Sequence, residues 1–213
     1  QPKEECKSYR KEIFPYQWRI ALSWMSGYFI FQLFNPVLFA YCGASVAGQM
    51  GMTLTALNGI FSLVLSWTST KVPMWSKDYP VLDASVSSTL RQSSLVCFIC
   101  LCIFWGFLYA LDIMHIGLAA RFIPLTLAIL LGSTIFINNI INIWATYLRC
   151  HKKEPFLIQA VIVGICCAIS TILGAKFFGL DGVVDGYTIV VFFISLPISF
   201  YIFKSKRRLY HGQ

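Results

Sequence analysis

The stretch Val86–Leu111, VSSTLRQSSLVCFICLCIFWGFLYAL, decides the class of fold, because Arg91 is its only charged residue. An α-helix needs about 20 predominantly apolar residues to cross the hydrocarbon core of a bilayer. This stretch exceeds that length. We therefore predict a membrane-spanning helix over residues 86–111.

The rest of the chain follows the same pattern. Its 213 residues are 57% hydrophobic and only 12% charged, whereas about 25% of the residues in soluble proteins are charged. This composition excludes a soluble globular domain, and it excludes intrinsic disorder as well. We predict an all-α integral membrane protein built as a bundle of six transmembrane helices. The other five apolar stretches are residues 18–41, 45–70, 117–148, 156–177 and 183–203.

The net charge of +8 is distributed by membrane side rather than gathered in one patch. Fifteen of the 17 Lys and Arg residues fall in the terminal segments or in alternate connections, and only Arg121 and Lys176 fall in the others. Cytoplasmic segments of membrane proteins carry an excess of Lys and Arg. We therefore predict that both termini are cytoplasmic, and we exclude nucleic acid as a partner.

The predicted organisation has three parts. Residues 1–17 form a cytoplasmic interfacial segment, residues 18–204 form the six-helix transmembrane lobe, and residues 205–213 form a basic cytoplasmic tail. Because the chain begins at Gln1 and not at Met, we expect it to be part of a longer protein.

The first two apolar stretches are joined by the very short connection Tyr41–Gly43. We therefore expect them to form an antiparallel helical hairpin. Two pairs of small residues follow at i, i+4 spacing, Ala44 with Gly48 and Ala47 with Gly51. Such pairs let helix backbones approach closely in lipid, and we expect close packing at these positions.

The sequence offers little for enzyme chemistry. Most of its nine acidic residues lie in tails, loops or the ends of apolar stretches, and the three His residues lie in loops or the tail. Cys97, Cys100 and Cys102 have the spacing of metal ligands, but in an apolar helix Cys acts as a small hydrophobic residue. We predict no catalytic residue, no metal and no cofactor, and hence a protein that is not an enzyme.

Several polar side chains fall within the apolar stretches, where such groups are costly and face a cavity or another helix. We expect four asparagines to hydrogen-bond a substrate, although asparagines also join helices to each other. Three cations near the predicted cytoplasmic ends of the apolar stretches are candidates for attracting a phosphate-bearing headgroup, although such cations also snorkel to the membrane interface. The candidate substrate-binding residues are Arg19, Lys71, Arg91, Asn35, Asn58, Asn138 and Asn142, and Asp185 is a candidate for ion coupling.

Four segments carry a resemblance to a known family. They are WRIALSWMSGYFIFQLFNP (residues 18–36), VAGQMGM (46–52), YLRCHKKEPF (147–156) and FGLDGVVDGY (178–187). In this order they resemble bacterial polysaccharide biosynthesis membrane proteins. These are flippases of the O-antigen or lipid-linked oligosaccharide type, in the multidrug/oligosaccharidyl-lipid/polysaccharide (MOP) exporter superfamily. The resemblance covers nearly the whole chain from Trp18 to Arg208.

The resemblance implies a multi-pass transporter of two six-helix lobes in the bacterial inner (cytoplasmic) membrane. This chain would be the C-terminal lobe, and its partners would be an N-terminal lobe, membrane lipid and the lipid-linked oligosaccharide. The implied mechanism is alternating access, which moves a prenyl-pyrophosphate-linked oligosaccharide across the membrane for surface polysaccharides such as lipopolysaccharide. Two other interpretations stay open: a MATE-like small-molecule exporter that uses a membrane acid such as Asp185, and an integral membrane transferase or assembly subunit.

Overall fold

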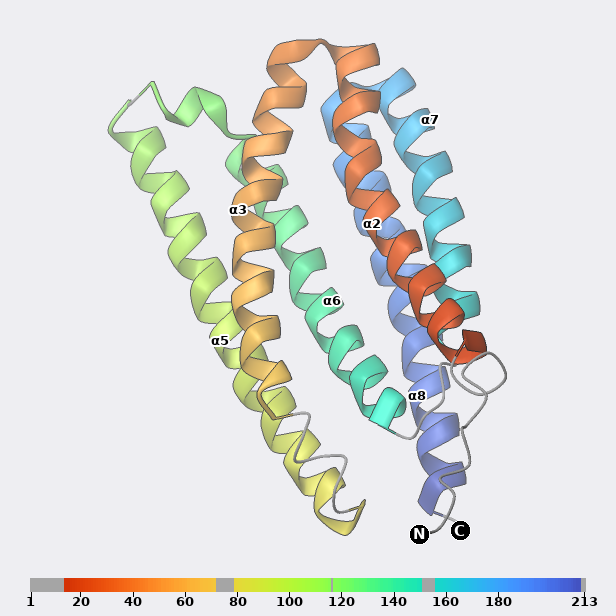
Figure 1. The fold of residues 1–213 in the computed structure, drawn as a ribbon. Coiled ribbons are helices and arrows are strands. Elements are labelled where there is room, and N and C mark those ends of the chain that lie inside the picture. Colours follow the sequence, from red (N-terminus) through yellow and green to blue (C-terminus); the bar gives the residue numbers. More distant parts are fainter. Residues whose placement is uncertain (1–13, 72–78, 116, 151–155, 212–213) are drawn as a thin grey trace, which may run out of the picture.

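The computed structural model describes residues 14–71, 79–115, 117–150 and 156–211, and every regular element in these ranges is helical (Figure 1). This confirms the predicted all-α class. The long helices run side by side and are joined at their ends. In chain order the elements are α2 (Phe14–Cys42), α3 (Ala44–Ser69), α5 (Tyr79–Ile113), the 3₁₀ turn η1 (Ala119–Arg121), α6 (Leu125–Cys150), α7 (Leu157–Val190), the π-helical turn η2 (Val191–Ser195) and α8 (Leu196–His211).

Several of the long helices have the length and composition of membrane-spanning helices. Among the described residues, four helical runs satisfy both measures. They are Ala44–Ser69, Ser85–Ile113, Leu125–Cys150 and Leu157–Arg207. Large apolar side chains face outward along them, since Ile103, Phe178 and Phe193 are 67%, 76% and 76% exposed. An apolar surface of this kind fits contact with lipid, while the count of six spans and the cytoplasmic termini stay predictions.

The first and last helices extend beyond the predicted boundaries of the lobe, residues 18 and 204. α2 begins at Phe14, so the predicted interfacial segment 1–17 ends inside a helix, and its first 13 residues lie outside the described part. α8 continues to His211, so most of the predicted tail 205–213 is helical.

The start of α6 also differs from the prediction, which began the fourth apolar stretch at residue 117. The helix begins at Leu125, after an extended residue, Phe122, with φ −105° and ψ 159°. Pro124 accounts for the difference, because a proline disfavours helical backbone at the residue before it. The Pro124 oxygen then accepts from the Ala128 N–H at 3.0 Å, which completes the first turn of α6.

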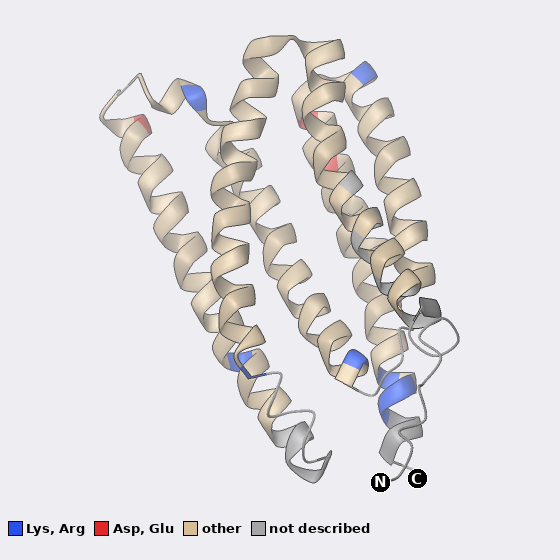
Figure 2. Ribbon diagram, viewed as in Figure 1, with Lys and Arg blue, Asp and Glu red and all other residues tan. Residues whose placement is uncertain are grey.

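The two ends of the bundle differ in charge (Figure 2). One end contains the α2–α3 turn at Gly43, whose φ of 90° is a conformation that favours glycine. At that end Gln49 also holds η1 by donating to the Ala120 oxygen at 2.9 Å. The opposite end carries most of the described basic residues, and we call it the cation-rich end. Its basic residues are Lys71, Arg91, Arg149, Lys204, Lys206 and Arg207, whereas Arg121 and Lys176 lie at the first end.

α7 reverses direction at Gly179, where φ is 64° and ψ is −136°. The two legs on either side of Gly179 run antiparallel (Figure 1). Gly174 lies against Gly182, and Ser170 lies against Gly186. A Cβ atom built on Gly182 would be 2.6 Å from the Gly174 oxygen, so the two backbones are in contact. Small residues on both legs are what allow this approach.

Of the glycines predicted to pack closely in α3, one does and one does not. A Cβ atom built on Gly48 would meet nothing within 4 Å, so the expected close approach does not occur there. A Cβ atom on Gly51 would meet Asn35 Nδ2 at 3.4 Å, so this position does pack against α2. Close approach instead occurs within α7, where Gly182 meets the backbone of Gly174 and Gly186 meets the side chain of Ser170. Gly182 and Gly186 form an i, i+4 pair that was not among those predicted.

α6 is the central helix of the bundle. Half of the residues in its most apolar 18-residue segment are buried, compared with 28% in the corresponding segment of each of the other three candidate spans. Buried polar groups join α6 to α3 and α5, because Thr68 donates to Ser93 Oγ at 3.5 Å and Ser93 donates to Asn139 Oδ1 at 3.2 Å. This chain of hydrogen bonds sets the rotation of α6 about its axis, and so decides which of its side chains face the other way.

We predict that Gly182→Ala destabilises the fold, because the added methyl group must push the two legs of α7 apart. Overpacking of this kind costs about 1–3 kcal/mol. Thermal unfolding of the detergent-solubilised protein, followed by tryptophan fluorescence, measures the effect. Gly59→Ala is the matched control, since its Cβ would meet nothing within 4 Å. Equal unfolding temperatures for the two variants would show that the contact between the legs is not tight.

Candidate functional site

A cavity of about 360 Å³ lies between α2, α3, α6, α7 and η2, in the half of the bundle nearer the cation-rich end. Its walls are mainly apolar, with a limited set of polar side chains, as is typical of ligand-binding cavities. The side chains with polar groups are Ser23, Tyr28, Asn58, Asn138, Asn142, Arg149, Gln159, Tyr187 and Ser195. These residues come from five elements, so the cavity exists only once the bundle has assembled.

One face of α6 supplies a polar stripe along the cavity. Asn138, Asn142, Ala145 and Arg149 all line it, at spacings of four, three and four residues. These spacings place them on one side of a helix. The stripe covers about 16 Å from Asn138 to Arg149, at 1.5 Å per residue. It therefore leads from the middle of the bundle to the cation-rich end.

Tyr187 closes the inner end of this stripe. Asn138 Nδ2 donates to the Tyr187 hydroxyl at 2.9 Å, which joins α6 to the second leg of α7. Phe31 and Phe34 of α2 pack edge-to-face on the Tyr187 ring, with centroids 5.9 and 5.2 Å away. Tyr187 is thus held from two sides, and its hydroxyl is fixed at the cavity wall.

Gln159 forms the wall between α7 and η2. Its Nε2 donates to the Ser195 carbonyl oxygen at 3.1 Å and also to Ser199 Oγ. The side chain is 4% exposed, and its Oε1 has no hydrogen-bond partner within the described structure. Single π-helical turns such as η2 occur frequently at functional sites, and here Ser195 of that turn lines the cavity.

The chemistry of the cavity is that of neutral polar groups beside aromatic rings. Tyr28, Phe31, Phe61 and Phe156 supply rings, and Arg149 supplies the positive charge at the mouth. No Asp or Glu is among the described residues that line it. Such a surface suits a ligand rich in hydroxyl groups and carrying negative charge at one end, because Arg forms strong hydrogen bonds to phosphate.

Three of the predicted site residues meet at this cavity. Asn58, Asn138 and Asn142 reach it from α3 and α6. Asn35 does not line it. It is an exposed residue of α2 whose side chain lies beside Gly51, towards the other end of the bundle.

Two of the three predicted cations, Lys71 and Arg91, lie elsewhere. Lys71, at the end of α3, donates to Gln92 Oε1 at 2.6 Å, and its Nζ lies 5.6 Å from the centre of the Trp67 ring. Arg91 is exposed on α5, and neither it nor Lys71 lines the cavity. Arg19 belongs to α2, but its side chain lies outside the described residues.

Asp185, the candidate for ion coupling, is exposed on the second leg of α7 and does not line the cavity. Tyr187, two residues later, faces the cavity instead. Residues two apart lie on nearly opposite sides of a helix, so the burial of Tyr187 accounts for the outward position of Asp185.

Arg149, Gln159 and Tyr187 belong to the site although they were not predicted. Arg149 had a recognisable signal, because it follows Asn142 by seven residues on the same helix face. Its position beside a basic connection instead favoured a role in membrane topology. Gln159 had the same signal as the asparagines, an amide within the apolar stretch 156–177. Tyr187 had no comparable signal, since its place depends on how the second leg of α7 packs against α6.

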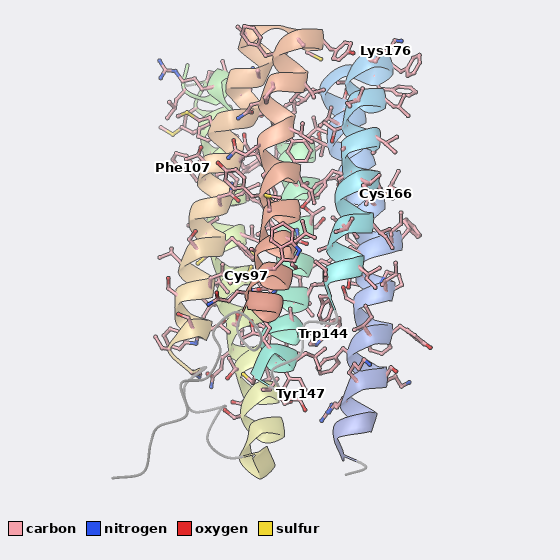
Figure 3. The ribbon with its side chains drawn as sticks, turned by 45° about the vertical axis from the view of Figure 1, so that its right-hand side comes forward. Cys97, Phe107, Trp144, Tyr147, Cys166 and Lys176 are labelled. Atoms are coloured by element: carbon pink, nitrogen blue, oxygen red, sulfur yellow. The ribbon has the colours of Figure 1, made fainter. Side chains whose placement is uncertain are left out.

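The cysteines that have metal-ligand spacing do not converge. Cys97, labelled in Figure 3, lies on α5 and is buried, whereas Cys102 on the same helix is exposed. In the part of the chain that the structure describes, no group of three or more His, Cys, Asp or Glu side chains is placed to hold a metal ion.

We predict that Asn138 and Tyr187 are energetically coupled. A double-mutant cycle with Asn138→Ala and Tyr187→Phe, read from the unfolding free energy in detergent, is expected to give about 0.6 kcal/mol, the average for hydrogen bonds between membrane helices. Tyr28→Phe serves as the control partner, because Tyr28 lines the same cavity but is 65% exposed. Strict additivity of Asn138→Ala and Tyr187→Phe would contradict the coupling.

The cavity, the charge of the two ends and the arrangement of the helices are properties of this chain itself. The chain matches no protein-family model, no curated protein and no solved structure.

Proposed function

We propose that this chain is one lobe of a membrane transporter that flips a prenyl-pyrophosphate-linked oligosaccharide across the bacterial inner membrane. The chain would act in surface polysaccharide synthesis, as its resemblance to flippases of the MOP superfamily implies. The observation that carries the proposal is the cavity, with its neutral amide stripe leading to Arg149.

The topology that goes with this function has six spans and two cytoplasmic termini. α2, α3, α5 and α6 are four spans, the first leg of α7 is the fifth, and the second leg with η2 and α8 is the sixth. Support comes from the charge of the two ends, because most of the described basic residues lie at the cation-rich end. The positive-inside rule assigns that end to the cytoplasm.

The cavity suits the polar head of such a substrate. The amide and hydroxyl groups of Asn58, Asn142 and Ser195 offer donors and acceptors to sugar hydroxyls, and the aromatic walls offer apolar faces to sugar rings. Arg149, at the cytoplasmic mouth, offers charge-assisted hydrogen bonds to the pyrophosphate. The prenyl chain would remain outside the cavity, in lipid.

The two other interpretations receive less support. An ion-coupled exporter relies on an acid inside the membrane, yet Asp185 is exposed outside the cavity. A transferase commonly positions a His or a carboxylate as general base near its substrate, and the described lining of the cavity contains no His, Asp or Glu.

The motion that goes with the proposal is alternating access. A second lobe would close the open side of the cavity, and rocking of the two lobes would expose the cavity to each side of the membrane in turn. In this mechanism η2, which lines the cavity through Ser195, is the part of the wall that changes shape. A π-helical turn suits this role because it interrupts the regular hydrogen bonding of the sixth span.

The proposal is tested by deleting the full-length gene. We expect loss of surface polysaccharide on gels and accumulation of the complete lipid-linked oligosaccharide on the cytoplasmic face. Normal surface polysaccharide would contradict a flippase, and a lipid-linked unit lacking one sugar would indicate a transferase.

We further predict that Arg149→Ala, re-expressed in the deletion strain, lowers the transport rate about tenfold or more, because a hydrogen bond to a charged group is worth about 1.5–3 kcal/mol. Arg91→Ala is the matched control, since it removes the same charge at the same end of the bundle but outside the cavity. Immunoblots of isolated membranes establish equal amounts of each variant. Equal transport by both variants would remove Arg149 from the site.

A further inference from the structure

A second depression, of about 310 Å³, lies between the start of α7 and α8 at the cation-rich end. We call it the α7–α8 groove. Four isoleucines form its walls, two from each helix, and Ser205 and Lys206 lie at its end. The isoleucines are Ile158, Ile162, Ile198 and Ile202. Ile158 and Ile162 are 71% and 43% exposed, so the groove opens outward, to the surface that faces lipid.

The orientation of α8 is set by an aromatic contact on its other side. Trp144 of α6 stacks on Phe203 with centroids 5.3 Å apart and an interplanar angle of 15°. Tyr147 packs edge-to-face on the same ring at 5.5 Å. Figure 3 shows Trp144 and Tyr147 at the cation-rich end of α6. With Phe203 turned towards α6, the face of α8 that carries Ile198 and Ile202 is turned towards the groove.

The cations of α8 lie in different surroundings. Lys204 Nζ lies 5.8 Å from the centre of the Phe200 ring, and Arg207 lies 6.0 Å from the centre of the Phe203 ring. Lys206 is the described cation that lines the groove. Gln159 and the exposed Tyr201 line it as well. Neither α8 nor the first leg of α7 contains an Asp or Glu, so the groove is lined mainly by isoleucines and is positive at its end.

The length of the groove matches one leaflet. From Ile198 to Lys206 the groove extends about 12 Å along α8 at 1.5 Å per residue. Half of a hydrocarbon core is about 15 Å thick. An occupant with an apolar chain and a negative group at one end fits this combination of depth and charge.

We propose that the α7–α8 groove binds an anionic phospholipid of the leaflet at the cation-rich end. One acyl chain lies along the four isoleucines, and the headgroup phosphate meets Lys206. The site belongs to the outside of the bundle and does not depend on which solute the cavity carries. It ties the start of α7 to α8, and so stabilises the cavity wall at Gln159, which lies between the groove and the cavity.

The test is native mass spectrometry of the full-length protein titrated with phosphatidylglycerol or phosphatidylcholine of the same acyl composition. We expect one phosphatidylglycerol bound in preference to phosphatidylcholine. Lys206→Ala is expected to weaken phosphatidylglycerol binding about fivefold, which is the contribution of one basic residue near an anionic membrane surface. Lys204→Ala is the matched control, because it removes the same charge two residues away, outside the groove, and should keep the wild-type preference.

A second variant tests the apolar part of the site. Ile198→Trp fills the groove while leaving every cation in place, and we expect it to lose the bound phosphatidylglycerol while keeping the wild-type elution volume on size exclusion. Equal losses for Lys204→Ala and Lys206→Ala would overturn the proposal in favour of general surface charge. Equal affinity for the two phospholipids, or a co-purified polyprenyl lipid that phosphatidylglycerol does not displace, would overturn it as well.

Discussion

The close antiparallel contact between the two legs of α7 is the interaction on which the rest of this structure depends. Apolar side chains gain little by leaving lipid for each other, so helices in a membrane associate largely through van der Waals packing of small residues. Gly174 against Gly182 and Ser170 against Gly186 provide that packing. The contact brings Tyr187 opposite Asn138 and Ser195 opposite Gln159. Both the cavity and the α7–α8 groove follow from this return of the chain.

Two neighbouring asparagines of α6 show how the bundle divides its polar groups. Asn139 accepts from Ser93 in a buried chain that joins α6 to α5 and α3. Asn138 faces the cavity and donates to Tyr187. Consecutive residues on a helix point about 100° apart, so the first contact fixes the direction of the second. A structural hydrogen bond thereby orients the side chains that we assign to substrate.

Gln159 separates two environments of opposite character. On its inner side lies the cavity, with amides, aromatic rings and Arg149 at the mouth. On its outer side lies a groove of isoleucines that ends at Lys206. The hydrogen bonds from Gln159 to Ser195 and Ser199 join α7 to η2 and α8 between the cavity and the groove. These bonds satisfy the Nε2 donor of Gln159 inside the bundle, where an unpaired polar group is costly.

The sequence by itself determined the class of the protein and the approximate extent of most of its helices. Apolar stretches such as 86–111 exceed the thickness of a bilayer, and in lipid a backbone must satisfy its own hydrogen bonds, so helices were the expected outcome. It also singled out Asn58, Asn138 and Asn142 as polar residues within apolar helices, and these three do line the cavity. Only the tertiary structure decided which candidates share a cavity. Asn35, Lys71 and Arg91 lie outside it and Arg149, Gln159 and Tyr187 lie within it, because the rotation of each helix is set by contacts between residues far apart in the chain. The packing of Gly174 against Gly182 and the hydrogen bond of Ser93 to Asn139 are such contacts, and the spacing of residues along one helix does not encode them.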